Sequence, residues 1–179
     1  MRHIILTAAL IGALVLPARA TVLVPTDLGD LSQHARAIAL GEVIDVRAQW
    51  TDDRRTIETL VTLSTESYLK GELGQTVTFR VPGGTMGRFR NIVVGAPDFE
   101  VGQRVIVFLG ASGPRVPYVL GLAQGVYRVG VALDGAVLVT PPAVLPTAGG
   151  PVVRGAATRR PAPLAEFERQ VKALAGGSR

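Results

Sequence analysis

The chain of 179 residues contains no cysteine, so disulfide bonds, thiolate metal sites and lipid attachment at a processed N-terminal cysteine are excluded. Histidine is nearly as scarce, with only two in the chain. Neither a His-x-x-x-His zinc motif nor the Gly-x-Ser-x-Gly elbow of serine hydrolases occurs. We therefore expect no metal, no cofactor and no catalytic activity.

Aromatic residues make up only 5% of the chain, and the formal net charge is +5. Few aromatic side chains are thus available for stacking on bases, and the positive charge is too small to indicate a polyanionic partner by itself. The composition argues against a nucleic-acid-binding protein.

The first twenty residues have the pattern of a secretory signal peptide. A basic start (1–3) precedes an apolar run (4–16), and Ala18-Arg19-Ala20 forms a small-x-small cleavage site. The alternative, a membrane anchor, is disfavoured because the run is shorter than the roughly 20 residues a spanning helix needs. We expect cleavage before Thr21, a mature net charge of +3 after loss of Arg2 and Arg19, and a secreted or periplasmic protein that leaves the membrane.

Two long strands joined by a charged tip are predicted over residues 38–50 and 56–69. Strands of this length bury one face by curling, commonly into a small barrel, and Gly41 is a suitable bend. The residues expected on the inner faces are Ile38, Leu40, Ile44, Val46, Ala48 and Trp50 in the first strand, and Ile57, Val61, Leu63 and Leu69 in the second.

Shorter strands follow at 76–81, 103–109, 116–122, 125–131 and 136–140, with a further short one at 88–94. The segment 103–109 is apolar on both faces and is expected to be the most buried, and Asp134-Gly135 predicts a tight hairpin. A short helix capped by Thr26 precedes the strands. The expected organisation is a β-barrel domain (21–140), an irregular Pro/Gly-rich linker (141–163) and a C-terminal helix (164–175).

The segments ARAIALGEVIDV, TIETLVTLSTESYLKG and QRVIVFLG together resemble the netrin-like module of the tissue inhibitors of metalloproteinases over residues 21–129. They also resemble small secreted bacterial proteins without an assigned activity. This resemblance implies an all-β, OB-like barrel of five to seven strands. It also implies an alternative function: inhibition of a metalloprotease through the amine of Thr21. The chain departs from the animal inhibitors because it lacks their N-terminal cysteine and their disulfides.

Two residues are candidates for a hydrolase, which is the second alternative. His34 is expected on the outer half of the first helix, and a packing or surface role is favoured for it. Glu42 falls on the apolar side of its strand by parity, where a carboxylate would need a partner or a raised pKa. A bend at Gly41 that turns Glu42 outward is the favoured interpretation.

The glycine loop 82–87 suggests either a phosphate cradle or a tight barrel corner, and the corner is favoured because no helix start follows. Its neighbours form the most basic and aromatic cluster of the chain. The sequence favours an exported, non-catalytic binding module that recognises another exported protein, with a protease as one such partner. The expected interaction surface comprises Thr21, Val22, Arg80, Met86, Arg88, Phe89 and Arg90.

Overall fold

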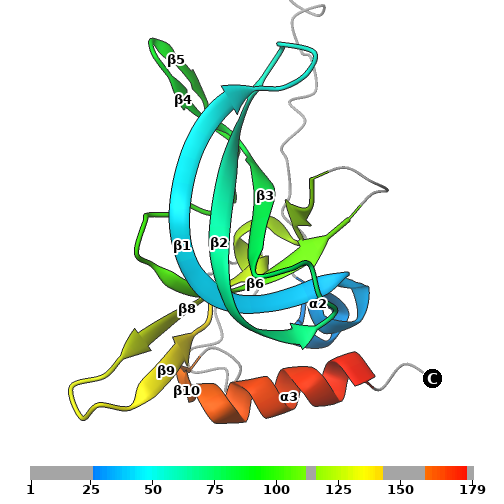
Figure 1. Ribbon diagram of the computed structural model, residues 1–179, viewed down its shortest axis with the longest axis vertical. Helices are drawn as coiled ribbons and strands as arrows, with labels where there is room; N and C mark the ends of the chain where they lie inside the picture. The colour runs from blue at the N-terminus through cyan, green and yellow to red at the C-terminus, as the bar shows by residue number, and fades with distance from the viewer. Residues whose placement is uncertain (1–25, 112–115, 143–159, 177–179) are drawn as a thin grey trace, which may run out of the picture.

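The computed structural model describes residues 26–111, 116–142 and 160–176. The expected signal peptide, Thr21, Val22 and most of the expected linker lie outside the described residues. The described chain is mainly β: eight strands form one mixed sheet, two more form a small hairpin, and a short helix and a longer one complete the fold (Figure 1).

The two longest strands, β1 (Ala37–Trp50) and β2 (Ile57–Lys70), pair antiparallel along their whole length. The four residues predicted to face inward from the second strand are all buried. Gly41 lies at a shift in the β1–β2 register, and a Cβ there would overlap the backbone oxygen of Ser64. The predicted bend is therefore a point of close backbone approach.

A ring of five strands curls from this pair through β3 (Thr76–Pro82), β7 (Tyr118–Val119) and β6 (Arg104–Gly110), and β6 pairs back onto β1. Every contact in the ring is antiparallel except that of β3 with β7. Within the described residues, these two strands meet in parallel through the single pair Arg80–Tyr118. We call this meeting point the seam, and the ring is incomplete there.

The predicted parity of β1 is wrong at Ile44. Its side chain is 47% exposed, whereas its neighbour Val43 is fully buried. The cause is a bulge between Val43 and Asp45, which leaves Ile44 without a ladder partner and switches the face of every later residue. Glu42, just before the bulge, is exposed, as the favoured interpretation expected.

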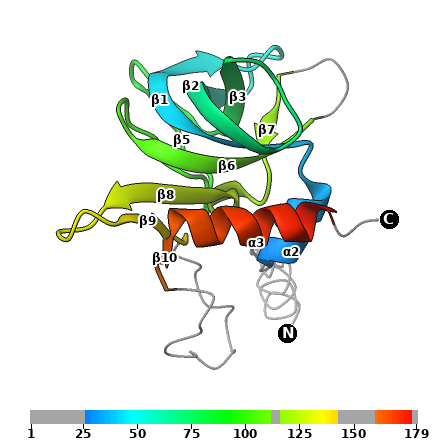
Figure 2. The ribbon, with the colours of Figure 1, turned by 60° about the horizontal axis from the view of Figure 1, so that its bottom comes forward.

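Two apolar cores share β6, and this strand is buried on both faces as the sequence predicted. Val105, Val107 and Leu109 face the interior of the ring, where Phe79 packs edge to face on Phe99. Ile106 and Phe108 face the opposite way, into a second core beneath the ring. Two helices cover this second core (Figure 2).

The helices are α2 (Leu28–His34) and α3 (Leu164–Gly176). Thr26 is not the N-cap of α2: Asp27 is, because its carboxylate accepts a hydrogen bond from Asp30 N (2.7 Å). The helix ends at His34 because Ala35 is extended and the amide of Arg36 donates to the carbonyl of Leu109 in the sheet. The C-terminal helix is found where the sequence predicted it, and Phe167 and Val171 of α3 are buried.

The remaining elements differ from the prediction in three places. Residues 84–91 form a hairpin, β4 (Gly84–Met86) and β5 (Phe89–Asn91), instead of one strand over 88–94. Strand β7 is short because Gly121 and Leu122 take left-handed conformations and lead into a 3-10 helix, η1 (Leu122–Gly125). Within the expected linker, β10 (Ala162–Pro163) pairs with the sheet.

The hairpin predicted from Asp134-Gly135 is confirmed. It joins β8 (Val126–Val131) to β9 (Val137–Thr140), with Gly135 at a positive φ of 84°. The Asp134 carboxylate accepts a hydrogen bond from the amide of Ala136 and so stabilises the turn. None of the helices that the structure describes is long and apolar enough to cross a membrane.

Replacing Lys70 by Met should destabilise the protein. The Lys70 ammonium donates to the last carbonyls of α2, those of Ser32 (2.8 Å) and Gln33 (2.7 Å), and so joins the end of β2 to the helix. We expect a loss of about 2 kcal/mol in the free energy of unfolding in urea. Lys172→Met, which removes only an exposed contact of 3.9 Å with Glu168, is the control and should change little. Equal midpoints for both variants would contradict the role of Lys70.

Alkaline pH should weaken the second core through Tyr127. Burial, with a smaller contribution from the charge of Asp27, raises the pKa of Tyr127 to about 12. The phenol of the unfolded chain ionises near 10, so this stabilisation is complete below pH 10 and is lost as the pH rises through 12. Between pH 9 and 11.5, the wild type should lose about 2 kcal/mol more than Tyr127→Phe in urea unfolding. Parallel losses in the two proteins would show that Tyr127 does not contribute.

Candidate functional site

The β4–β5 hairpin lies against the outer end of β2, beside the β1–β2 tip (Figure 1). Its base is fixed by three hydrogen bonds: Gly83 N to Ile57 O (3.0 Å), Thr59 Oγ1 to Gly83 O (2.8 Å) and Asn91 Nδ2 to Ile57 O (3.2 Å). The glycine loop is therefore a tight corner that positions the hairpin against β2.

An aromatic contact joins the hairpin to the tip. The rings of Trp50 and Phe89 pack edge to face with centroids 5.5 Å apart, and the Arg88 guanidinium lies 5.1 Å from the Phe89 ring centre. Phe89 is nevertheless 48% exposed and Met86 38% exposed. We call five side chains of the hairpin and the adjoining tip the hairpin surface: Trp50, Met86, Arg88, Phe89 and Arg90. Arg90 follows Phe89 on β5 and therefore points to the other face of the hairpin.

The charged tip next to this surface is organised by local hydrogen bonds. Asp53 accepts from the Thr51 hydroxyl (2.6 Å) and from the amide of Arg55 (3.1 Å). These two bonds lower the pKa of the Asp53 carboxyl. Asp53 therefore maintains the turn, and neither it nor Asp52 forms an ion pair with the described arginines.

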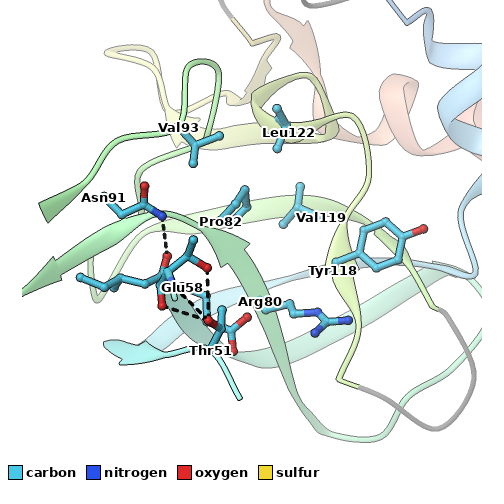
Figure 3. A pocket seen from close by; sticks show the side chains of 11 residues that line it. Thr51, Glu58, Arg80, Pro82, Asn91, Val93, Tyr118, Val119 and Leu122 are labelled. Atoms are coloured by element: carbon cyan, nitrogen blue, oxygen red, sulfur yellow. Dashed lines mark hydrogen bonds between the residues drawn. The ribbon is translucent and has the colours of Figure 1, made fainter. Parts of the chain in front are cut away.

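A pocket of about 420 Å³ opens at the seam, between the ends of β2, β3 and β7 (Figure 3). We call it the seam pocket. Its volume lies within the range of about 300–1,000 Å³ that is usual for small-molecule sites. The lining residues are Thr51, Thr56, Ile57, Glu58, Arg80, Pro82, Asn91, Val93, Tyr118, Val119 and Leu122.

Two opposite charges line the seam pocket without pairing with each other. Glu58 is held at one carboxylate oxygen by Gln49 Nε2 (2.9 Å), and Arg80 makes no side-chain hydrogen bond or ion pair with the described residues. Arg80 and Tyr118 lie at one side of the pocket and Asn91 at the other (Figure 3). The pocket thus combines apolar walls with separated polar groups, which is the usual character of a binding site.

The structure divides the interaction surface predicted from the sequence. Met86, Arg88, Phe89 and Arg90 lie together on the hairpin, whereas Arg80 lines the seam pocket. The first two predicted residues, Thr21 and Val22, lie outside the described residues. The sequence offered no signal for Glu58, Asn91 and Tyr118, because they come from three separate elements that only the ring closure brings together.

The candidate catalytic residues lie elsewhere. His34 is exposed, and its Nδ1 makes a hydrogen bond with the carbonyl of Asp30, one turn earlier in α2 (2.8 Å). Glu42 is exposed on β1, and neither residue lines the seam pocket. Among the described residues, no three His, Asp or Glu side chains gather in a way that could hold a metal ion.

No protein-family model matches the chain, and no curated protein or solved structure gives a significant match. The chemistry of the hairpin surface and of the seam pocket is therefore the basis for assigning a function.

Replacing Gly84 by Ala should displace the hairpin. Gly84 has a φ of 149°, and a Cβ there would lie 2.7 Å from Thr59 Oγ1. Loss of the Trp50–Phe89 contact should shift the fluorescence of the single tryptophan to longer wavelength. Gly130→Ala is the matched control, since an added Cβ meets no atom within 4 Å. An unchanged tryptophan spectrum in Gly84→Ala would contradict this packing.

Proposed function

We propose that the protein is an exported, non-catalytic binding module of OB type whose hairpin surface recognises another exported protein. The strand order β1-β2-β3-β7-β6, with β6 returning to β1, supports the OB-type assignment. An OB barrel is a five-stranded, partly open Greek key, and its loops and outer face commonly carry the binding site. The netrin-like resemblance of the sequence points to the same class.

Export is supported by the sequence alone, through the basic start, the apolar run and the cleavage pattern before Thr21. These residues lie outside the described chain, so the secreted or periplasmic location stays a prediction. The alternative of a metalloprotease inhibitor depends on the amine of Thr21 and stays a prediction for the same reason. The hydrolase alternative gains no support from the exposed positions of His34 and Glu42.

The observation that carries the proposal is the exposed Phe89 ring, which Trp50 holds from one side while Arg88 lies over it. Aromatic and arginine side chains dominate the binding energy of protein interfaces, particularly when their orientation is fixed before binding. Residues 83–97 contain two arginines and no acidic residue. A partner surface that combines an apolar pocket with carboxylates would be complementary to this hairpin.

Replacing Phe89 by Ala should weaken capture of the partner. The mature protein is immobilised and exposed to the exported protein fraction of its source organism, and the bound proteins are identified and titrated. We expect the wild type to retain a specific partner and Phe89→Ala to bind it at least about tenfold more weakly, because truncating a central aromatic anchor commonly costs that much.

Leu133→Ala is the matched control for this experiment. Leu133 is a fully exposed apolar residue in the β8–β9 turn, and that hairpin lies at the other end of the molecule (Figure 1). The control should capture the same partner with unchanged affinity. The proposal is wrong if the Phe89 variant binds every captured protein as tightly as the wild type does.

A further inference from the structure

The seam pocket has a cation at one side that no other described residue neutralises. Arg80 extends from the outer face of β3, and the ring of Tyr118 packs over Gly110, which fixes the wall beside it. An unpaired guanidinium at the edge of an apolar pocket is suited to bind a carboxylate through two parallel hydrogen bonds. This side of the pocket favours an anionic group.

Hydrogen-bond acceptors gather elsewhere on the pocket wall. Gln49 occupies one oxygen of Glu58, and the other makes no hydrogen bond with the described residues. Asn91 donates through Nδ2 to the carbonyl of Ile57, which leaves its Oδ1 as an acceptor. A carboxylate and an amide oxygen together favour an ammonium group.

The positions of Glu58 and Arg80 on the sheet indicate the size of the ligand. In the β2–β3 ladder, Glu58 lies opposite Pro82, so Arg80 is its diagonal neighbour on the same face. The Cα atoms of such neighbours are about 7–8 Å apart, and both side chains lie on the same side of the sheet. A single amino acid carries its ammonium and carboxylate on one carbon, whereas an extended dipeptide spans about 7 Å at roughly 3.5 Å per residue.

Five apolar residues form much of the remaining pocket wall. Ile57, Pro82, Val93, Val119 and Leu122 line it, and Ile57 and Val119 are themselves buried at the end of the ring core. Apolar side chains of a ligand would thus be removed from water at this surface.

We propose that the seam pocket binds short zwitterionic peptides with apolar side chains, with their carboxylate on Arg80 and their ammonium group on Glu58 and Asn91. This is a small-ligand site, distinct from the hairpin surface and independent of whether that surface binds a protein.

Titration calorimetry of the whole mature protein with L-leucyl-L-leucine tests the proposal. The N-acetylated and C-amidated forms of this dipeptide each lack one charge and should bind at least about tenfold more weakly. Arg80→Met should bind the dipeptide weakly and no longer distinguish it from its amide. Glu58→Gln should bind leucyl-leucine and its N-acetylated form equally, because the negative charge that attracts the ammonium group is removed.

Two controls and one structural readout locate the effect. Arg169→Met and Glu166→Gln change exposed charges on α3 and should bind like the wild type. Phe89→Ala should also bind the dipeptide normally, which separates this site from the hairpin surface. In the wild type, the methyl resonances of Val93, Val119 and Leu122 should shift on addition of the dipeptide.

The proposal is overturned if the wild type does not bind leucyl-leucine, if it binds the blocked forms or free leucine equally well, or if the methyl shifts lie outside the pocket. It is also overturned if the two α3 variants lose as much affinity as the pocket variants. The series of ligands with the wild type decides the question even where a pocket variant fails to fold.

Discussion

The structure depends on the first half of β1, which is hydrogen-bonded on both edges and buried on both faces. Residues 38–42 pair with β2 on one side, and residues 37–42 pair with β6 on the other. Ala39 faces the interior of the ring, and Ile38 and Leu40 face the helices. One short segment thus closes the ring and also contributes to the second core, which the helices cover. Small residues at Ala37, Ala39 and Gly41 suit a strand that is enclosed from every direction.

The functional surfaces arise where this enclosure ends. After the bulge at Ile44, the second half of β1 extends with β2 to a tip, and the β4–β5 hairpin packs against this tip. At the seam, β3 and β7 share one residue pair, and the gap beyond it becomes the pocket. The hairpin surface and the seam pocket therefore both lie where the sheet has no further strand, so that side chains form the surface there.

Much of the architecture could be predicted from the sequence, because the spacing of apolar residues along a strand indicates which face is buried. The two-sided apolar run 103–109, the alternation of 56–69 and the Asp134-Gly135 turn all led to the observed elements. Periodicity failed at Ile44 and at residues 116–122, where a bulge and two left-handed residues interrupt the strand geometry. Such irregularities are decided by tertiary contacts and leave no period in the sequence.

The candidate site was only partly predictable for a related reason. Arg88, Phe89 and Arg90 are adjacent in sequence, so the chain order alone places them in one cluster. Glu58, Arg80, Asn91 and Tyr118 share no local pattern, and their assembly depends on how the ring closes. The glycines of the loop 82–87 indicated a corner, but not that Asn91 would connect the hairpin to β2.

The return of β6 to β1 also determines the order in which the chain can fold. The β1–β2–β3 meander consists of neighbours in sequence and can pair early, whereas Ile38 to Glu42 must wait for β6 before their second edge is satisfied. Until then, this apolar strand edge is open to pairing with other chains. Because the contact closes a long loop, we expect it to form late, and we expect aggregation to compete with folding until β6 pairs with β1.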